Sequence, residues 1–193
     1  MSLLIDALPS SYEYGGRVYE LKTDFRDWIR FELLLTDEDI PVPDKAPKLL
    51  EMIFPVIPPD EKLWDFILWF YRCGKKQQEA SGKKSGAEKQ SAPYSFEYDD
   101  CYIYSSFKEI YGMDLTEIRY LHWWKFRGMF MSLHDCKITE IMGYRTEKIT
   151  SKTPADRKAF LTKVKKIYAL PRSQTEQHRL DELKKLKEQY YGH

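Results

Sequence analysis

Apolar residues recur at helical spacing along most of the chain, and one short stretch near its start alternates instead. The alternating stretch, residues 11–21, is centred on Gly15 and Gly16, which suit a tight turn, and it predicts a β-hairpin in which Tyr12 faces Tyr19. Elsewhere the pattern predicts helices bounded by prolines, glycines and capping residues, over about residues 24–35, 44–54, 61–73, 99–111, 116–134, 139–146, 154–170 and 175–191. Thr23 or Asp24 is expected to cap the first of these helices, Asp44 to cap the second with Pro47 in its first turn, and Gly112 to end the fourth. The chain is therefore expected to be all-α (mainly helical) with a short N-terminal β-hairpin.

Two of the expected helices are apolar on nearly every side, which is typical of buried helices. The first covers residues 61–73. The second, residues 116–134, has only a narrow polar strip of His122, Lys125 and Ser132, and we expect it to be the most buried helix of the fold. A capping box at residues 114–117, in which Asp and Glu side chains satisfy free backbone amides, marks its predicted start.

One internal segment has a composition that cannot support a core. Residues 74–92 are rich in Lys, Gly and Ser and contain no aromatic or branched aliphatic residue. Such a segment buries too little apolar surface to offset the entropy lost on ordering, so we expect a flexible surface loop. We accordingly predict that residues 1–170 form a single helical domain carrying this loop, and that residues 171–193 form a separate basic C-terminal helical arm.

The C-terminal arm is basic and has only a thin apolar edge. Residues 152–193 contain 11 Lys and Arg against 5 Asp and Glu, a balance of +6, whereas the rest of the chain has a balance of −5. A helix with so narrow an edge is marginal in water, so it either docks on its own domain or binds a partner, and both alternatives stay open. The candidate partner-binding residues of the arm are Leu180, Leu183, Leu186, Tyr190, Lys184 and Lys185.

Composition narrows the class of protein further. The 193 residues include 31 Lys and Arg and 30 Asp and Glu, and this near-neutral balance argues against a nucleic acid as the main partner. The three cysteines are far apart and odd in number, as in proteins with reduced thiols. No apolar run is long enough to span a membrane and the start lacks a basic secretory signal, so we expect a cytoplasmic chain with no membrane partner.

The sequence contains little that suggests catalysis. It has no glycine-rich phosphate-binding motif and no C-x-x-C pair, and the consecutive residues of the triplet at 134–136 (His-Asp-Cys) point in different directions, so neither a metal nor another cofactor is expected. His122 with Asp114 or Glu117 offers a base and an acid, but a histidine bonded to a carbonyl or carboxylate on a core helix is the favoured interpretation. We expect the protein not to be an enzyme.

Residues 94–133 contain three blocks of spaced residues that resemble the bacteriophage gene-product-fifteen family, found in long-tailed phages and prophages of Gram-positive bacteria. The double-Trp block is the most specific of them, and the similarity extends to about residue 170. The blocks are Asp99-x-x-Tyr102-Ile103-Tyr104-x-x-Phe107, Tyr111-Gly112-x-Asp114-Leu115 and Leu121-His122-Trp123-Trp124-Lys125-Phe126.

The resemblance implies a tail assembly chaperone encoded beside the tape-measure gene. Such a protein binds the tape-measure protein, keeps it soluble and assists tail-tube polymerisation around it, so the implied partners are the tape-measure and tail-tube proteins, with a homo-oligomer also possible. It also implies a location in the bacterial host cytoplasm and absence from the mature virion. The alternative is a small phage nucleic-acid-binding helical module that uses the basic arm and loop. The motif residues expected to be structural are Tyr104, Gly112, Asp114, Leu115, His122, Trp123, Trp124 and Phe126.

Overall fold

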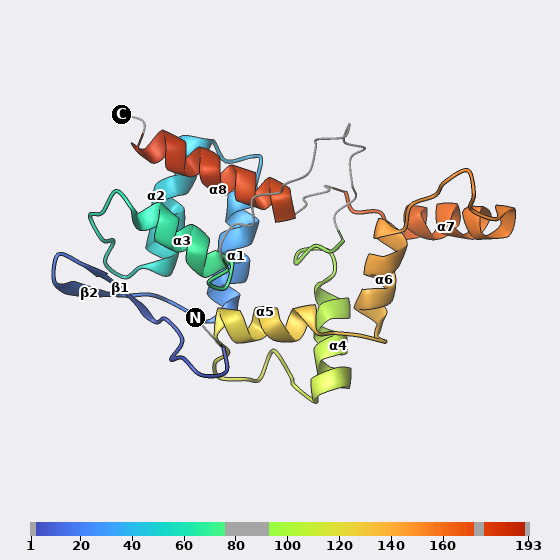
Figure 1. Ribbon diagram of the computed structural model, residues 1–193, viewed down its shortest axis with the longest axis horizontal. Coiled ribbons are helices and arrows are strands. Elements are labelled where there is room, and N and C mark those ends of the chain that lie inside the picture. The colour runs from blue at the N-terminus through green and yellow to red at the C-terminus, as the bar shows by residue number, and fades with distance from the viewer. Residues whose placement is uncertain (1–2, 76–92, 172–175, 192–193) are drawn as a thin grey trace. The chain divides into compact units, whose positions relative to one another are not determined.

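The computed structural model describes residues 3–75, 93–171 and 176–191. These residues form eight helices and one two-stranded antiparallel hairpin, so the predicted mainly helical fold with an N-terminal hairpin is confirmed (Figure 1). The predicted loop at residues 74–92 lies almost entirely outside the described residues.

The described residues fall into two compact units. The first unit consists of residues 3–75, 119–131 and 177–191, and the second of residues 93–118 and 132–171. In this division the last helix belongs to the first unit. Whether residues 1–170 fold without that helix stays a prediction.

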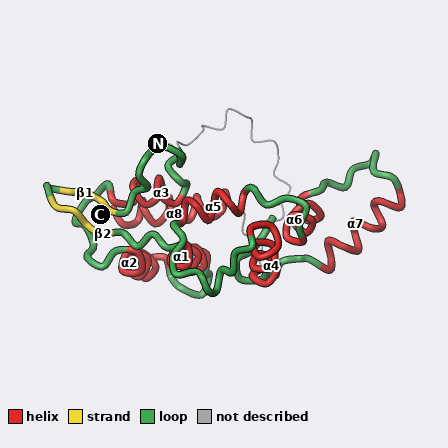
Figure 2. The backbone as a smooth tube through the Cα atoms, turned by 90° about the horizontal axis from the view of Figure 1, so that it is seen from below, coloured by secondary structure: helices red, strands yellow, loops and turns green. Residues whose placement is uncertain are grey.

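The hairpin opens the first unit and has the predicted register. Its strands, β1 (Ser11–Tyr14) and β2 (Arg17–Glu20), lie side by side (Figure 2). Their register places Tyr12 opposite Tyr19. Gly15 and Gly16 have φ values of +59° and +74°, which glycine adopts without strain and which a two-residue turn requires.

Aromatic side chains form the core of the first unit. Trp28 is fully buried, and its ring centroid lies 4.6 Å from that of Phe70 and 6.3 Å from that of Trp123. Asp24 begins the first helix by accepting the backbone N–H of Arg26 at 3.0 Å, as predicted for a cap. The helices of this unit are α1 (Phe25–Thr36), α2 (Val42–Ile53), α3 (Leu63–Tyr71), α5 (Trp123–Met131) and α8 (Glu176–Tyr191).

Helix α2 begins earlier than predicted. We expected Asp44 to cap it and Pro47 to fall in the first turn, but the helix starts at Val42 and contains Pro47 in its interior. The backbone N–H groups of Asp44 and Lys45 both donate to the carbonyl of Pro41, at 3.0 and 3.3 Å, so the first turn closes two residues earlier.

The predicted long helix over residues 116–134 is wrong in its first part, because α5 starts only at Trp123. Trp123 donates its backbone N–H to the carbonyl of Thr23 at 2.7 Å, and Phe25 donates to the carbonyl of Leu121 at 2.9 Å. These bonds hold the backbone before Trp123 extended. The predicted capping box is also wrong. The Asp114 carboxylate accepts the N–H of Thr116 and closes a turn, and this turn is not followed directly by a helix.

The second unit contains three helices around a smaller core. Gly112 ends the first of them with a φ of +64°, as predicted, and Cys136 precedes the second, which starts two residues before the predicted position. The Asp99 carboxylate and the Arg145 guanidinium form a two-pronged buried ion pair, with N–O distances of 2.6 and 2.8 Å. The helices are α4 (Asp100–Tyr111), α6 (Lys137–Thr146) and α7 (Ala155–Ile167).

Candidate functional site

Figure 1 shows α8 beside the other helices of its own unit. It packs against them through the face that carries Leu183 and Leu186. Leu183 and Leu186 are each only 2% exposed, and Arg179, one turn before Leu183, is 3% exposed. Residues four and seven positions after Arg179 lie on the same face of a helix, so these three side chains form one continuous contact. The apolar edge seen in the sequence is therefore covered by the rest of the first unit.

A buried ion pair anchors α8 to α1. Arg179 Nη1 lies 3.1 Å from Glu32 Oε1, and the two side chains are 3% and 4% exposed. The hydroxyl of Tyr71, on α3, donates to the other carboxylate oxygen of Glu32 at 2.6 Å. Glu32 thus connects three helices, because it accepts from α3 and α8 while belonging to α1.

Two further contacts follow the last turns of α8. Lys187 Nζ lies 2.5 Å from Asp65 Oδ1, and the ring of Tyr190 meets the ring of Trp64 edge to face, with centroids 6.1 Å apart. Both partners come from α3. We name the part of the first unit that receives α8 the docking surface, defined by Glu32, Trp64, Asp65 and Tyr71.

The six candidate partner-binding residues therefore divide into two groups. Leu183 and Leu186 are buried against the first unit, whereas Tyr190 is 46% exposed. Lys185 is exposed and pairs with Glu182 at 2.8 Å. The remaining two residues, Leu180 and Lys184, are half-buried. Of the two alternatives for the arm, the structure shows docking on its own chain, and contact of these residues with another protein stays a prediction.

The pair that anchors α8 was missed by the sequence interpretation, which singled out neither Arg179 nor Glu32. A signal was present, because Glu32 is the one carboxylate within the apolar run of residues 31–35. Acidic residues are almost never fully buried unless they are paired. An acid in such a run therefore predicts a buried partner, although the sequence does not say which one.

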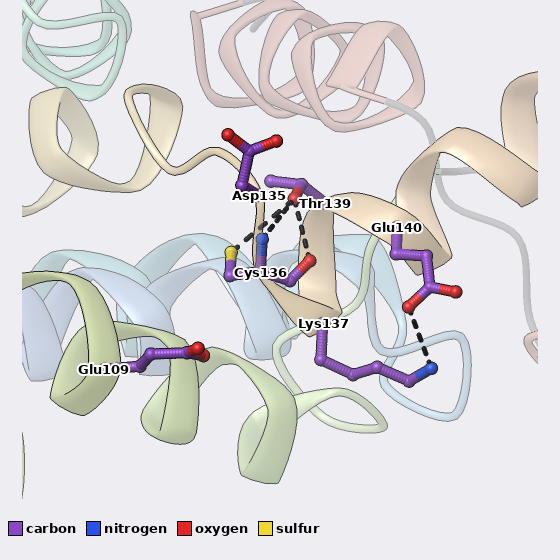
Figure 3. A pocket seen from close by; sticks show the side chains of 6 residues that line it. All are labelled: Glu109, Asp135, Cys136, Lys137, Thr139 and Glu140. Atoms are coloured by element: carbon purple, nitrogen blue, oxygen red, sulfur yellow. Dashed lines mark hydrogen bonds and ion pairs between the residues drawn. The ribbon is translucent and has the colours of Figure 1, made fainter.

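The second unit has an open hollow between α4 and the start of α6, with a volume of about 630 Å³ (Figure 3). Glu140 pairs with Lys137 at 3.0 Å, and hydrogen bonds from Tyr144 and Lys137 lower the pKa of its carboxyl. The thiol of Cys136 lies 3.6 Å from the hydroxyl of Thr139. These side chains are bonded to one another and present no pair of nucleophile and base. The hollow is lined by Glu109, Asp135, Cys136, Lys137, Thr139 and Glu140.

Within the described part of the chain, no group of three His, Cys, Asp or Glu side chains could hold a metal ion. The same part of the chain contains no helix long and apolar enough to cross a membrane.

His122, the candidate base, is buried and uses both ring nitrogens for backbone groups. Its Nδ1 accepts the N–H of Trp124 at 3.0 Å, and its Nε2 lies 3.1 Å from the carbonyl oxygen of Pro9, to which it donates. Burial lowers the pKa of His122, which favours the neutral ring that this arrangement requires. The structure therefore places His122 as the residue that starts α5 and ties it to the chain before the hairpin.

Asp114, one of the two candidate acids, is engaged within the second unit. Its carboxylate accepts hydrogen bonds from Thr116 at 2.6 Å, Tyr104 at 2.8 Å and Lys108 at 2.9 Å. Bonds from Thr116, Lys108 and Tyr104 hold the pKa of this carboxyl well below its usual range. Tyr104, Gly112 and Asp114 thus stabilise the end of α4 and the turn after it, and Leu115 in that turn is 9% exposed.

The double-Trp block attaches α5 to the end of α3. Trp123 donates its indole N–H to the carbonyl of Tyr71 at 3.1 Å, and Trp124 donates to the carbonyl of Phe70 at 2.8 Å. Phe126, one turn later, stacks on Phe25 with ring centroids 4.7 Å apart. All three are 3% exposed or less, and their bonds lie inside the first unit.

Comparison with known proteins supports the resemblance found in the motifs. The family model described as Bacteriophage Gp15 protein matches residues 4–170, which is most of the chain. The match contains the docking surface and ends before α8. No curated protein and no solved structure gives a significant match. The chain therefore belongs to the bacteriophage Gp15 protein family.

Proposed function

We propose that the chain is a tail assembly chaperone that binds the tape-measure protein of a long-tailed phage, keeps it soluble and assists polymerisation of the tail tube around it. Family membership makes it a phage protein and favours an assembly-related role. The tape-measure protein as its partner is our inference. The proposed role requires binding and release and involves no chemical step.

The observation that carries the proposal is the way the first unit holds α8. The docking surface receives an amphipathic helix through one buried ion pair, between Glu32 and Arg179, one exposed ion pair at the end of the helix, and two buried leucines. A tape measure is a very long helix that exposes apolar stripes until the tube encloses it, so its chaperone needs surfaces that accept helices. A contact of a few side chains also permits release, because the growing tube has to displace the chaperone.

The charges of α8 favour a protein partner over a nucleic acid. Arg179, Lys185 and Lys187 each pair with a carboxylate, at 3.1, 2.8 and 2.5 Å. Binding to nucleic acid gains free energy mainly when cations neutralise phosphates, and a cation already paired with a carboxylate has to lose that partner first. The nucleic-acid-binding alternative therefore loses support from the arm, and its other basic element, the loop, lies largely outside the described residues.

Co-expression with the tape-measure product of the same phage tests the proposal. We expect the soluble fraction of that product to rise when the chain is present, and the two proteins to purify together. A tape-measure product that stays equally insoluble with and without the chain contradicts the proposal. A salt titration separates the alternative, because binding through phosphates weakens steeply with salt whereas packing of apolar side chains does not.

A further inference from the structure

The docking surface has requirements of its own that any bound helix must meet. Glu32 is buried on α1, and when α8 leaves it keeps the hydroxyl of Tyr71 but loses its cation. A helix that covers this carboxylate again without supplying a cation buries an uncompensated charge, which is costly, so the surface favours a positive charge at this point. The apolar atoms covered by Leu183 and Leu186 favour two apolar side chains on the same face of the incoming helix.

These requirements amount to a spacing rule. Arg179, Leu183 and Leu186 occupy positions i, i+4 and i+7 of one helix, and among residues 178–190 of α8 they are the three most buried side chains. Most other positions of α8 are polar and exposed or half-buried. Any helix with a basic residue at i and leucines at i+4 and i+7 therefore presents the same contact to the docking surface.

The extent of the family match separates the surface from the helix that covers it. All four residues that define the docking surface lie between residues 32 and 71, inside the matched range of residues 4–170. Helix α8 lies after that range. The surface thus lies inside the range that the family model matches, whereas its occupant in this chain lies outside that range.

We propose that the docking surface is a binding site for an amphipathic helix of a protein partner, carrying a basic residue followed by leucines at the fourth and seventh positions, and that α8 occupies this site in the free protein. The inference rests on the proposed function, because it assigns the surface through which the chaperone holds a helical partner. Helix α8 shields the site while no partner is present and helps to displace the partner when it is released.

Competition in the unmodified full chain is the most direct test. The probe is a synthetic ¹³C-labelled peptide with the sequence of residues 176–191, so that its fragments differ in mass from those of the protein. Because α8 is tethered, its effective concentration at the site is on the order of millimolar, and the peptide is added at that level or above. We expect hydrogen exchange of the α8 amides to accelerate, while exchange in α2 is unchanged. A peptide with the Arg179→Gln change is the matched control and is expected to have little effect.

A second measurement uses a full chain in which α8 cannot dock. Leu183→Asp combined with Leu186→Asp places two charges on the buried face, whereas Gln189→Asp adds a charge at an exposed position of the same helix and serves as control. We expect a fluorescein-labelled peptide of residues 176–191 to bind the double variant at least about tenfold more tightly than the unmodified chain or the control, because the site is no longer occupied. Should the double variant fail to fold, the exchange experiment decides alone.

The two proposals can fail separately. If the peptide leaves exchange of α8 unchanged, or if the Arg179→Gln peptide competes equally well, the helix-binding site is refuted even when the tape-measure product still purifies with the chain. If the peptide displaces α8 and the tape-measure product does not bind, the site stands and the proposed function is wrong.

Discussion

Replacing Arg179 with Met tests whether the buried ion pair holds α8 in place. Met keeps much of the length of the arginine stem but removes the charge, so Glu32 remains buried without its cation. Removing one partner of a buried pair typically costs about 3–5 kcal/mol. The loss is limited here because α8 can detach and expose Glu32 to water, and the hydroxyl of Tyr71 still donates to the carboxylate. We therefore expect the free energy of unfolding to fall by about 3 kcal/mol, the low end of that range.

Two further variants make this measurement specific. Adding Glu32→Gln to Arg179→Met removes the uncompensated charge and keeps an acceptor for Tyr71. The double variant is therefore expected to lose about 2 kcal/mol less unfolding free energy than the two single variants lose in sum. Lys185→Met is the matched control, because Lys185 is exposed and pairs only within α8, and it is expected to cost less than about 0.5 kcal/mol.

Urea denaturation followed by circular dichroism at the helical band measures all five proteins, which include Glu32→Gln alone as the second single variant of the cycle. The tryptophan fluorescence of the first unit provides a second signal, since Trp64 lies beside Tyr190 of α8. Equal losses of unfolding free energy in Arg179→Met and Lys185→Met would show that the buried pair contributes nothing to docking. The argument from burial would then be refuted.

Three other predictions concern the rest of the fold. Trp124→Ala is expected to cost about 3–5 kcal/mol because a buried indole and its hydrogen bond are lost, whereas Met131→Ala, at a 65% exposed position of the same helix, should have little effect in the same denaturation assay. Burial lowers the pKa of His122 in the folded chain, so the unfolded chain binds the proton more readily and stability should fall as pH is lowered through the usual histidine range. His122→Asn, which can still accept the N–H of Trp124, should show a smaller fall in thermal melts across that range, and an identical pH profile would contradict this assignment. Deleting residues 76–90 should leave the melting temperature nearly unchanged, since a long loop adds little closure entropy, and early melting would show that the segment is packed.

Local patterns in the sequence were sufficient where neighbouring residues decide the structure. The hairpin follows from the Gly15-Gly16 turn, and the end of α4 follows from Gly112, because in both places the backbone needs a positive φ that glycine provides. The cap at Asp24 is equally local. These predictions succeeded because the residues that determine each feature are adjacent in sequence.

The predictions that failed depend on residues far apart in the chain. The start of α5 is set by backbone bonds that join residues 121 and 123 to residues 25 and 23, at the start of α1, and no periodicity in residues 116–134 contains that information. The pairing of Glu32 with Arg179 is similar, since each residue alone indicates only that a buried partner is needed. The apolar edge of α8 was visible in the sequence, but the surface that covers it was not.

The distance along the chain between Glu32 and Arg179 also has a consequence during synthesis. The ribosome adds about 5–20 residues per second, so Arg179 follows Glu32 by roughly 7–30 s. Throughout that interval the Glu32 carboxylate of the nascent chain cannot pair with Arg179, which has not yet been synthesised. A helix already present in the cell with a suitably placed cation can reach Glu32 first. If the proposed partner supplies that helix, the order in which the two proteins are translated influences which helix occupies the site.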